Sequence, residues 1–335
     1  MSLHEYHVNE FAVQSDFALP HDKDTHSVIP VSESNRITIR RASLAELPCL
    51  MRKIRLQMIY DVGDGFLLEP RVGPGGLALH IDFKGRAFTV DCADECLPVA
   101  AAWAIHAGLG AATVTRGGVP LHGAGLEVAG RYIALMAASG SGKSTLSWFL
   151  MQQGARFGND DLVPVYLAGD EAIAYPSISL FPKLQREAVD RHGLDYSTLK
   201  PADNGTGEDE YYVPMPPTRR VPGPAPLAAV FLLRPRPLDG HGLLRVERMA
   251  DLVTAERLPE DEAAKTLWAN LHALWLIGKW VDQRRIAALC QGLAARVPVY
   301  TLSYPKAYAL LPALAARIAW LAGKSGQDGI KSVRR

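Results

Sequence analysis

The feature that most constrains the fold is a glycine-rich segment, Ala-Ala-Ser-Gly-Ser-Gly-Lys-Ser at residues 137–144. Residues 132–137 (YIALMA) lead into it and have the composition of a buried strand, and residues 146–151 (LSWFLM) follow as an apolar helix. A strand that turns through glycines into a helix is the context of a phosphate-binding loop (P-loop), with the pattern G-x-x-x-x-G-K-[ST]. The chain departs from this pattern at Ala137, which stands in place of glycine. The segment therefore predicts an α/β protein with a nucleoside-triphosphate site.

The residue types of this loop suit a triphosphate. Glycines at 140 and 142 let the backbone turn so that successive N–H groups point at phosphate oxygens, and the following helix directs its positive dipole end at the same anion. Lysine at 143 reaches the outer phosphates, and the serine hydroxyl at 144 is a ligand for the Mg²⁺ that bridges them. A glycine-rich turn without a ligand is the alternative. ATP and Mg²⁺ are the expected cofactors, and the expected nucleotide-binding residues are Ser139, Gly140, Ser141, Gly142, Lys143, Ser144 and Thr145.

Two adjacent carboxylates, Asp160 and Asp161, follow a short predicted strand at residues 155–157, 17 and 18 residues after Lys143. In a parallel α/β sheet the end of that strand lies at the carboxyl edge, beside the P-loop. Because successive strand residues point to opposite faces, we expect different tasks, one aspartate holding Mg²⁺ and the other taking the acceptor's proton. A polar turn without a catalytic role is the alternative. His122 is a further candidate, although a single histidine is more often structural.

Patterning divides the chain into three predicted regions. Residues 1–92 form a β-rich N-terminal region, residues 93–250 a P-loop core, and residues 251–335 a C-terminal helical region packed on that core. Residues 96–115 carry no charge and are long enough to span a bilayer. Their many Ala and Gly residues, and their few large aliphatic ones, predict a buried core helix instead.

Residues 197–226 are rich in Pro, Gly, Asp and Asn and are predicted to form a long loop. Arg219 and Arg220 lie in this segment. They are candidates for cationic clamps that close over the phosphates, and the alternative is that both are solvated loop charges.

Composition limits the class of partner. The chain has 36 Lys and Arg against 35 Asp and Glu, a net charge of +1, which argues against a nucleic-acid-binding protein. Four cysteines in 335 residues are too few for a disulfide framework. The first residues show neither the basic nor the apolar segment of a secretory signal. We therefore expect a cytoplasmic protein with no membrane and no nucleic-acid partner, and the sequence leaves open whether it is a homo-oligomer.

These motifs resemble the catalytic domain of the bacterial HPr kinase/phosphorylase family. That family has a His-Gly pair on the strand before the P-loop, a Ser-Gly-x-Gly-Lys-Ser loop, and then an Asp-Asp pair. The resemblance is specific over residues 118–184 and weak over residues 219–233. It implies an α/β P-loop kinase core of the HPr kinase/phosphoenolpyruvate carboxykinase type. The matching segments are His122-Gly123, residues 139–144 and Asp160-Asp161.

The resemblance also implies roles for individual residues. Asp161 would bind Mg²⁺, and Asp160 would be the general base toward a serine hydroxyl, positioned or tuned by His122. Lys143 would complete the catalytic set. In the family a Gly-rich segment with Glu and Arg follows the Asp pair, whereas this chain has residues 175–183 (YPSISLFPK), so neither phosphorylase activity nor HPr as acceptor is carried over.

The sequence as a whole is interpreted as an ATP-dependent serine kinase, a phosphotransferase. Tyr6 and the segment FALP at residues 17–20 resemble HPr-kinase-related proteins found beside peptide-biosynthesis genes, including lasso-peptide kinases. The expected acceptor is therefore a serine of a peptide or small protein, such as a ribosomal peptide precursor. A small-molecule P-loop kinase and a non-catalytic nucleotide-binding regulator are the alternatives.

Overall fold

The computed structural model describes residues 3–8, 10–19, 35–44, 52–55, 59–70, 76–176, 181–202, 209–237, 249–274 and 281–332. It is a mixed α/β structure with several sheets, and the chain divides into two compact units. Unit 1 comprises Met1–Gly118, Ser177–Pro214 and His272–Asp282, and unit 2 comprises Val119–Pro176, Met215–Leu271 and Gln283–Arg335. This division differs from the predicted boundaries after residues 92 and 250. The helix that follows residue 93 belongs with the N-terminal sheet, and unit 2 contains chain from both sides of residue 250.

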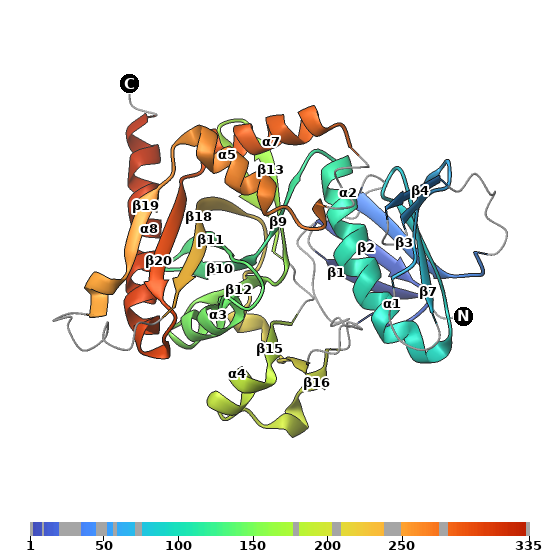
Figure 1. Ribbon diagram of the computed structural model, residues 1–335, viewed down its shortest axis with the longest axis horizontal. Coiled ribbons are helices and arrows are strands. Elements are labelled where there is room, and N and C mark those ends of the chain that lie inside the picture. The colour runs from blue at the N-terminus through green and yellow to red at the C-terminus, as the bar shows by residue number, and fades with distance from the viewer. Residues whose placement is uncertain are drawn as a thin grey trace. The chain divides into compact units, whose positions relative to one another are not determined.

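Unit 1 is built on an eight-stranded sheet in the order β1-β2-β3-β8-β7-β6-β5-β4 (Figure 1). The pairs β2/β3 and β3/β8 are parallel and the other pairs are antiparallel. Burial alternates along β3 and β8 as a half-buried sheet requires, and Ile37 and Ile39 of β3 are fully buried. The strands are β1 (His4–Val8), β2 (Phe11–Ser15), β3 (Arg36–Arg41), β4 (Arg52–Arg55), β5 (Ile59–Asp61), β6 (Gly65–Leu68), β7 (Leu77–Asp82) and β8 (Ala87–Cys92).

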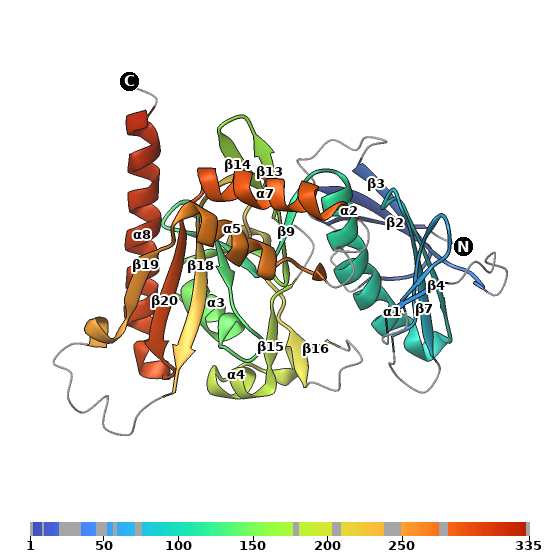
Figure 2. The same ribbon diagram turned by 45° about the horizontal axis from the view of Figure 1, so that its top comes forward.

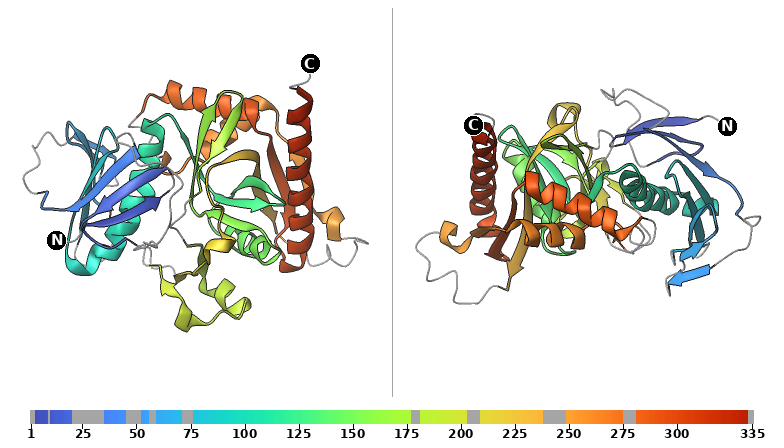
Figure 3. Two further views of the ribbon diagram at one scale, coloured as in Figure 1. Left: turned by 180° about the vertical axis from the view of Figure 1, so that it is seen from behind. Right: turned by 90° about the horizontal axis from the view of Figure 1, so that it is seen from above.

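A continuous helical segment, Asp94–Thr115, packs on β7 and β8 (Figure 3). By length and composition it could cross a membrane, but 78% of its most apolar stretch is buried inside the structure. The prediction of a buried core helix is confirmed. The segment consists of η2 (Asp94–Cys96), α1 (Leu97–Trp103), the π-helical turn η3 (Ala104–Gly108) and α2 (Leu109–Thr115).

The long loop predicted at residues 197–226 contains short ordered elements. A three-stranded sheet in the order β15-β17-β16 takes two strands from this segment. Residues 203–208 of the predicted loop and 177–180 of the segment 175–183 lie outside the described residues. The elements are β15 (Lys183–Gln185), α4 (Arg186–Arg191), η4 (Tyr196–Thr198), β16 (Lys200–Pro201), β17 (Glu210–Tyr212) and η5 (Pro217–Arg219).

Unit 2 contains a nine-stranded mixed sheet in the order β12-β10-β11-β18-β14-β13-β9, with β20 pairing to β18 and β19 to β20. The central strand β18 is parallel to β11 and to β20. The strand predicted at 132–137 is present within it as β11. The strands are β9 (Val119–His122), β10 (Ala124–Val128), β11 (Arg131–Met136), β12 (Arg156–Asn159), β13 (Leu162–Ala168), β14 (Glu171–Ala174), β18 (Ala225–Arg236), β19 (Thr254–Arg257) and β20 (Val299–Pro305).

Helices of unit 2 pack on this sheet as two sets. One set contacts β10, β11 and β18, and the other contacts β9, β13 and β14 (Figures 1 and 2). The first set is α3 (Lys143–Gln152) and α8 (Leu311–Ser332), and the second is α7 (Gln283–Arg296) with α5 (Glu260–Ala269) packed against it. The short helices η7 (Met249–Leu252) and η8 (Tyr308–Leu310) precede β19 and α8.

The prediction of a helical region from residue 251 onward is wrong in part. Strands β19 and β20 lie within it, and β20 pairs along seven residues of β18. Val299, Leu302 and Tyr304 of β20 are buried, so the strand is part of the core of the sheet. The strand lies between two longer helices, α7 and α8, whose apolar periodicity favoured a helical interpretation of the whole region.

Candidate functional site

The glycine-rich loop (residues 137–144) connects the buried strand β11 to the first turn of α3, as predicted. Gly140 has φ of 72° and Gly142 has φ of 86°, both in the left-handed region that favours glycine. The Ser141 N–H donates to the Ala138 carbonyl at 3.2 Å, closing a turn, and Gly142 is the N-cap of α3. The loop therefore leads into a helix N-terminus, where backbone amides and the helix dipole favour an anion.

Ala137, the one departure from the P-loop pattern, needs no special backbone conformation. The described non-glycine residues with positive φ are Ala129, Asp161 and Ala273, and Ala137 is not among them. Its side chain is 5% exposed and fits the core. An alanine therefore replaces the first glycine of the pattern without backbone strain.

The sheet brings the aspartate pair to the same edge as the loop, although not by the parallel arrangement that we predicted. Strand β10 lies between β11 and β12 and is antiparallel to both. Two strands that are each antiparallel to a third run in the same direction, so the carboxyl ends of β11 and β12 share one edge. The loop follows the first strand and Asp160-Asp161 follow the second.

At this edge the predicted residues meet in one charged cluster. The Lys143 Nζ lies 3.2 Å from Asp160 Oδ1 and 3.3 Å from Asp161 Oδ1. The three side chains are mostly buried, with exposed fractions of 12% for Lys143, 8% for Asp160 and 22% for Asp161. We call these three residues the Lys143 cluster. Its two carboxylates face one ammonium, so it carries a net negative charge of one when all three groups are ionised.

The expectation that the two aspartates point to opposite faces is wrong, because strand geometry ends before them. Strand β12 ends at Asn159, and Asp161 has φ of 63°, which non-glycine residues seldom adopt. The Leu162 N–H donates to the Asp160 carbonyl at 2.8 Å, which is the hydrogen bond of a three-residue γ-turn. This tight turn directs both carboxylates to the same ammonium.

His122 and Gly123 lie beside this turn, and His122 approaches Asp161, whereas the resemblance implied that it positions or tunes Asp160. The His122 Nε2 is 3.9 Å from Asp161 Oδ1, and its side chain is 46% exposed. The Gly123 N–H donates to the Asp161 carbonyl at 3.2 Å, which holds the turn from its other side. A Cβ at Gly123, which directly precedes β10, would lie 2.5 Å from the carbonyl oxygen of Leu135 in β11. The close approach of β10 and β11 therefore requires glycine here.

The hydrogen bonds of the two predicted clamp residues, Arg219 and Arg220, are made outside the Lys143 cluster. Arg219 donates to the carbonyl of Met151, near the carboxyl end of α3. At 1.5 Å per residue, this point is about 12 Å along the helix from Lys143. Arg220 is buried and its Nε donates to the Met215 carbonyl at 2.7 Å. These contacts fix the chain around β12 and α3, and the structure does not bring Arg219 to the loop.

Sequence reasoning missed two residues that contact the loop. The Lys306 Nζ donates to the Gly140 carbonyl at 2.8 Å, and the Tyr304 hydroxyl lies 3.5 Å from the Ser141 carbonyl oxygen. Both lie at the carboxyl end of β20 or just beyond it. The alternating run VYTLSY at residues 299–304, closed by a proline, was the available signal for a strand.

The donors near the loop suit a magnesium ion that arrives with phosphate. Mg²⁺ prefers oxygen ligands and is commonly held by one or two carboxylates together with substrate phosphates. Ser144, half buried in the first turn of α3, and Asp161 supply oxygen donors of this kind. The part of the chain that the structure describes contains no group of three or more His, Cys, Asp and Glu arranged for a metal. The residues therefore fit a shared ion better than a metal cage made by the protein alone.

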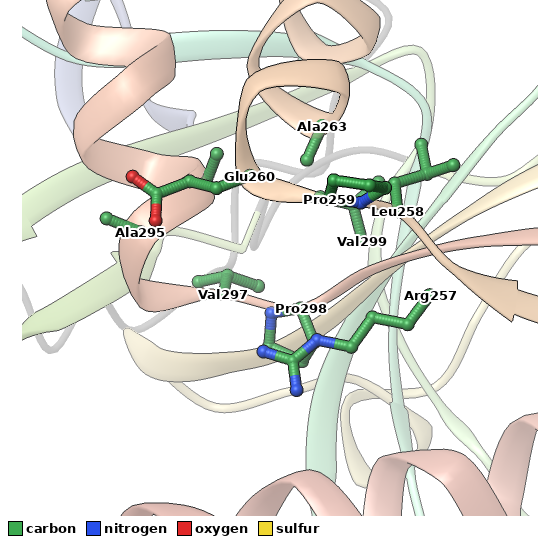
Figure 4. A pocket seen from close by; sticks show the side chains of 10 residues that line it. Arg257, Leu258, Pro259, Glu260, Ala263, Ala295, Val297, Pro298 and Val299 are labelled. Atoms are coloured by element: carbon green, nitrogen blue, oxygen red, sulfur yellow. The ribbon is translucent and has the colours of Figure 1, made fainter.

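A pocket of unit 2 lies away from the loop (Figure 4). It has a volume of about 360 Å³ and is formed where β19 leads into α5 and α7 leads into β20. Val299, at the amino end of β20, is part of its wall. Because Lys306 follows the carboxyl end of the same strand, the pocket is at the opposite edge of the sheet from the loop.

Comparisons with known proteins give a distant structural similarity. No protein-family model matches the chain, and no curated protein matches it. Among solved structures, the Hpr(Ser) kinase/phosphatase from Coxiella burnetii is similar with a TM-score of 0.31 and 14% sequence identity. That match covers 61% of this chain and 98% of the other. At this level the similarity assigns no role to any residue.

Proposed function

We propose that the glycine-rich loop is a P-loop and that the protein is an ATP-dependent kinase. The observation that carries the proposal is the position of the Lys143 ammonium, within 3.3 Å of two carboxylates at the start of a helix that a glycine turn precedes. A structural ion pair needs neither a second carboxylate nor a helix N-terminus. Phosphoryl transfer uses all of these groups, because it depends on positioning and on charge stabilisation.

In this proposal the residues of the cluster divide the work. Lys143 and the loop amides bind and orient the triphosphate, and Ser144 and Asp161 hold Mg²⁺. The ion supplies charge neutralisation of the phosphates. The oxygen of the acceptor hydroxyl attacks the terminal phosphorus, and the bond from this phosphorus to the leaving diphosphate breaks. Asp160, the more buried carboxylate, accepts the proton that the hydroxyl loses. His122 lies near enough to Asp161 to orient it.

The class of acceptor rests on the motif resemblance alone. His122-Gly123, the loop and Asp160-Asp161 match the HPr kinase/phosphorylase pattern, which supports a serine hydroxyl of a peptide or small protein as acceptor. The same resemblance supports a core of the HPr kinase/phosphoenolpyruvate carboxykinase type. The balanced charge favours a partner other than nucleic acid, the burial of the apolar helix at residues 94–115 favours a protein with no membrane partner, and the few cysteines suit the cytoplasm.

A transfer assay with ATP labelled at its terminal phosphate tests the proposal. The protein is incubated with Mg²⁺ and a panel of serine peptides, a panel of small alcohols, or no acceptor, and Lys143→Ala is the matched control. We expect label on peptide serine with the wild-type protein and not with the variant. Label on a small alcohol would favour a metabolite kinase. Hydrolysis alone, or turnover that Lys143→Ala leaves intact, would contradict a kinase at this loop.

A further inference from the structure

The outer side of the glycine-rich loop is held by the end of β20. The Lys306 Nζ donates to the Gly140 carbonyl at 2.8 Å, and the Tyr304 hydroxyl is 3.5 Å from the Ser141 carbonyl oxygen. The other ammonium at the loop, that of Lys143, faces the two aspartates instead. The loop backbone is therefore held by Lys306, while the ammonium of Lys143, a residue of the loop itself, is engaged by the two aspartates.

Tyr304 and Lys306 are fixed in place by the sheet of unit 2. Strand β20 is parallel to β18, which is parallel to β11, so its carboxyl end lies at the same edge as the loop. Tyr304 is 5% exposed, and the Lys306 N–H donates to the Arg236 carbonyl at 2.9 Å at the end of β18. Burial raises the pKa of Tyr304 to about 12, so its hydroxyl keeps its proton near neutral pH and can donate.

These contacts bear on the amides because the peptide bond is planar and trans. In each peptide unit the C=O and the N–H point in opposite directions. A Gly140 carbonyl that is held by Lys306 fixes the direction of the Ser141 N–H, which donates to the Ala138 carbonyl and closes the turn. The Ser141 carbonyl, which lies near the Tyr304 hydroxyl, fixes in the same way the direction of the Gly142 N–H at the start of α3. Glycines sample many backbone conformations unless the surroundings select one. A charge-assisted hydrogen bond from an ammonium is a strong selecting contact.

We propose that Lys306, assisted by Tyr304, is a positioning residue that holds the loop amides in their anion-binding arrangement before a nucleotide binds. This inference rests on the proposed function, since it takes the loop to be a triphosphate site. Lys306 touches the loop from outside, and its contribution is to the binding of MgATP more than to the transfer step. A binding site whose donors are already oriented loses less conformational entropy when its ligand arrives.

The test compares Lys306→Met, Lys306→Arg and Tyr304→Phe with the wild-type protein. Lys265→Met, a lysine exposed on α5 that has no contact with the loop, is the matched control. For Lys306→Met we expect Kd and KM for MgATP to rise about tenfold, the scale of one charged hydrogen bond, with kcat changed less than threefold. Lys306→Arg should restore most of the affinity, and Tyr304→Phe should have a smaller effect in the same direction.

Hydrogen exchange of residues 137–144 in the nucleotide-free protein gives a second readout. Exchange should be several-fold faster in Lys306→Met and unchanged in Lys265→Met. Unchanged exchange together with unchanged MgATP affinity in Lys306→Met would overturn the inference. A fall in kcat as large as the rise in KM, or an equal loss of MgATP affinity in Lys265→Met, would also overturn it.

The same experiment separates this inference from the proposed function. If Lys143→Ala weakens MgATP binding and Lys306→Met does not, only the role of Lys306 is overturned. If the wild-type protein binds no MgATP, both fail together.

Discussion

The two ends of β20 differ in what they offer to a ligand. Beyond its carboxyl end, Lys306 contacts the glycine-rich loop, and across the same edge of the sheet lies the Lys143 cluster. At its amino end, Val299 lines a cavity of about 360 Å³ whose other lining residues are mostly apolar. The carboxyl end of β20 lies near a cluster of converging charged side chains, and its amino end lines a cavity. Because phosphoryl transfer depends on oriented charge, the first end is the better candidate for chemistry even though the pocket is at the second.

The difference comes from how the backbone is treated at each end. The loop end contains two left-handed glycines, the left-handed Asp161 and the close approach at Gly123. Residues held in sparsely populated conformations persist only where their surroundings select them, and they gather at functional sites. The pocket end is an ordinary junction of two strands, β19 and β20, with two helices, α5 and α7.

The largest effect that would sharpen this comparison is expected from Asp160→Asn. Asparagine keeps the oxygen that accepts from Lys143 and from the Asp161 N–H, but it cannot take a proton. Transfer should fall by roughly 10²–10⁴-fold, the usual contribution of a general base. MgATP affinity, measured by calorimetric titration, should change only a few fold. A strong loss of MgATP binding would contradict the assignment of Asp160 as base.

A series at Asp161 separates its charge from its backbone conformation. Asp161→Gly, Asp161→Asn and Asp161→Ala all remove the carboxylate, so Mg²⁺-dependent transfer should fall by at least tenfold in each. Their free energies of unfolding should differ, because alanine at φ of 63° costs about 1–2 kcal/mol more than glycine, with asparagine between them.

Denaturant titration of the three Asp161 variants measures the order. Equal stability of the glycine and alanine variants would show that the turn relaxes without a left-handed residue. Full activity of any of the three would exclude Asp161 as a magnesium ligand.

A smaller effect is expected from Tyr132→Phe, behind the cluster. The Tyr132 hydroxyl is buried and donates to Asn159 Oδ1, and the Asn159 amide donates to the Tyr175 carbonyl at 3.0 Å. Burial raises the pKa of Tyr132, so the hydroxyl remains a donor. Removing it takes one buried hydrogen bond from Asn159, the last residue before the aspartates, at a cost of about 0.5–1.5 kcal/mol of stability.

We expect Tyr132→Phe to lower transfer only a few fold, by loosening the end of β12. Thermal unfolding and single-turnover transfer measure the two effects. A loss of transfer as large as that of Asp160→Asn, in a stably folded variant, would mean that Tyr132 takes part in the chemistry directly.

Much of this edge could be predicted from residue types, and the rest depends on geometry that the sequence hides. The strand, glycines and helix around Lys143 announce the loop, and the spacing to Asp160 places the carboxylates near it. The alternation rule failed for Asp161 because it applies inside a strand, and β12 ends two residues earlier. Lys306 was missed because β20, the strand that it follows, lies between two longer helices. A contact made across the sheet leaves no local pattern in the sequence.

The smallest effect is expected at the pocket, and it could break the comparison between the two ends of β20. Arg257 and Glu260 are the charged residues of its lining. Figure 4 shows them at different parts of the wall. Glu260 is in the first turn of α5, where a carboxylate interacts favourably with the helix dipole. Glu260→Gln should therefore cost about 0.3–1 kcal/mol of stability, and Arg257→Gln less.

Neither substitution should change KM for MgATP or the rate of transfer by more than about twofold, because the pocket and the loop lie at opposite edges of one sheet and exposed charges that far apart are screened by salt. Steady-state kinetics of the two variants, with Lys265→Met as a surface control, measures this. A tenfold loss of transfer in Glu260→Gln at unchanged stability would mean that the space at the amino end of β20 belongs to the reaction. The acceptor, and not the nucleotide, would then be the ligand to look for there.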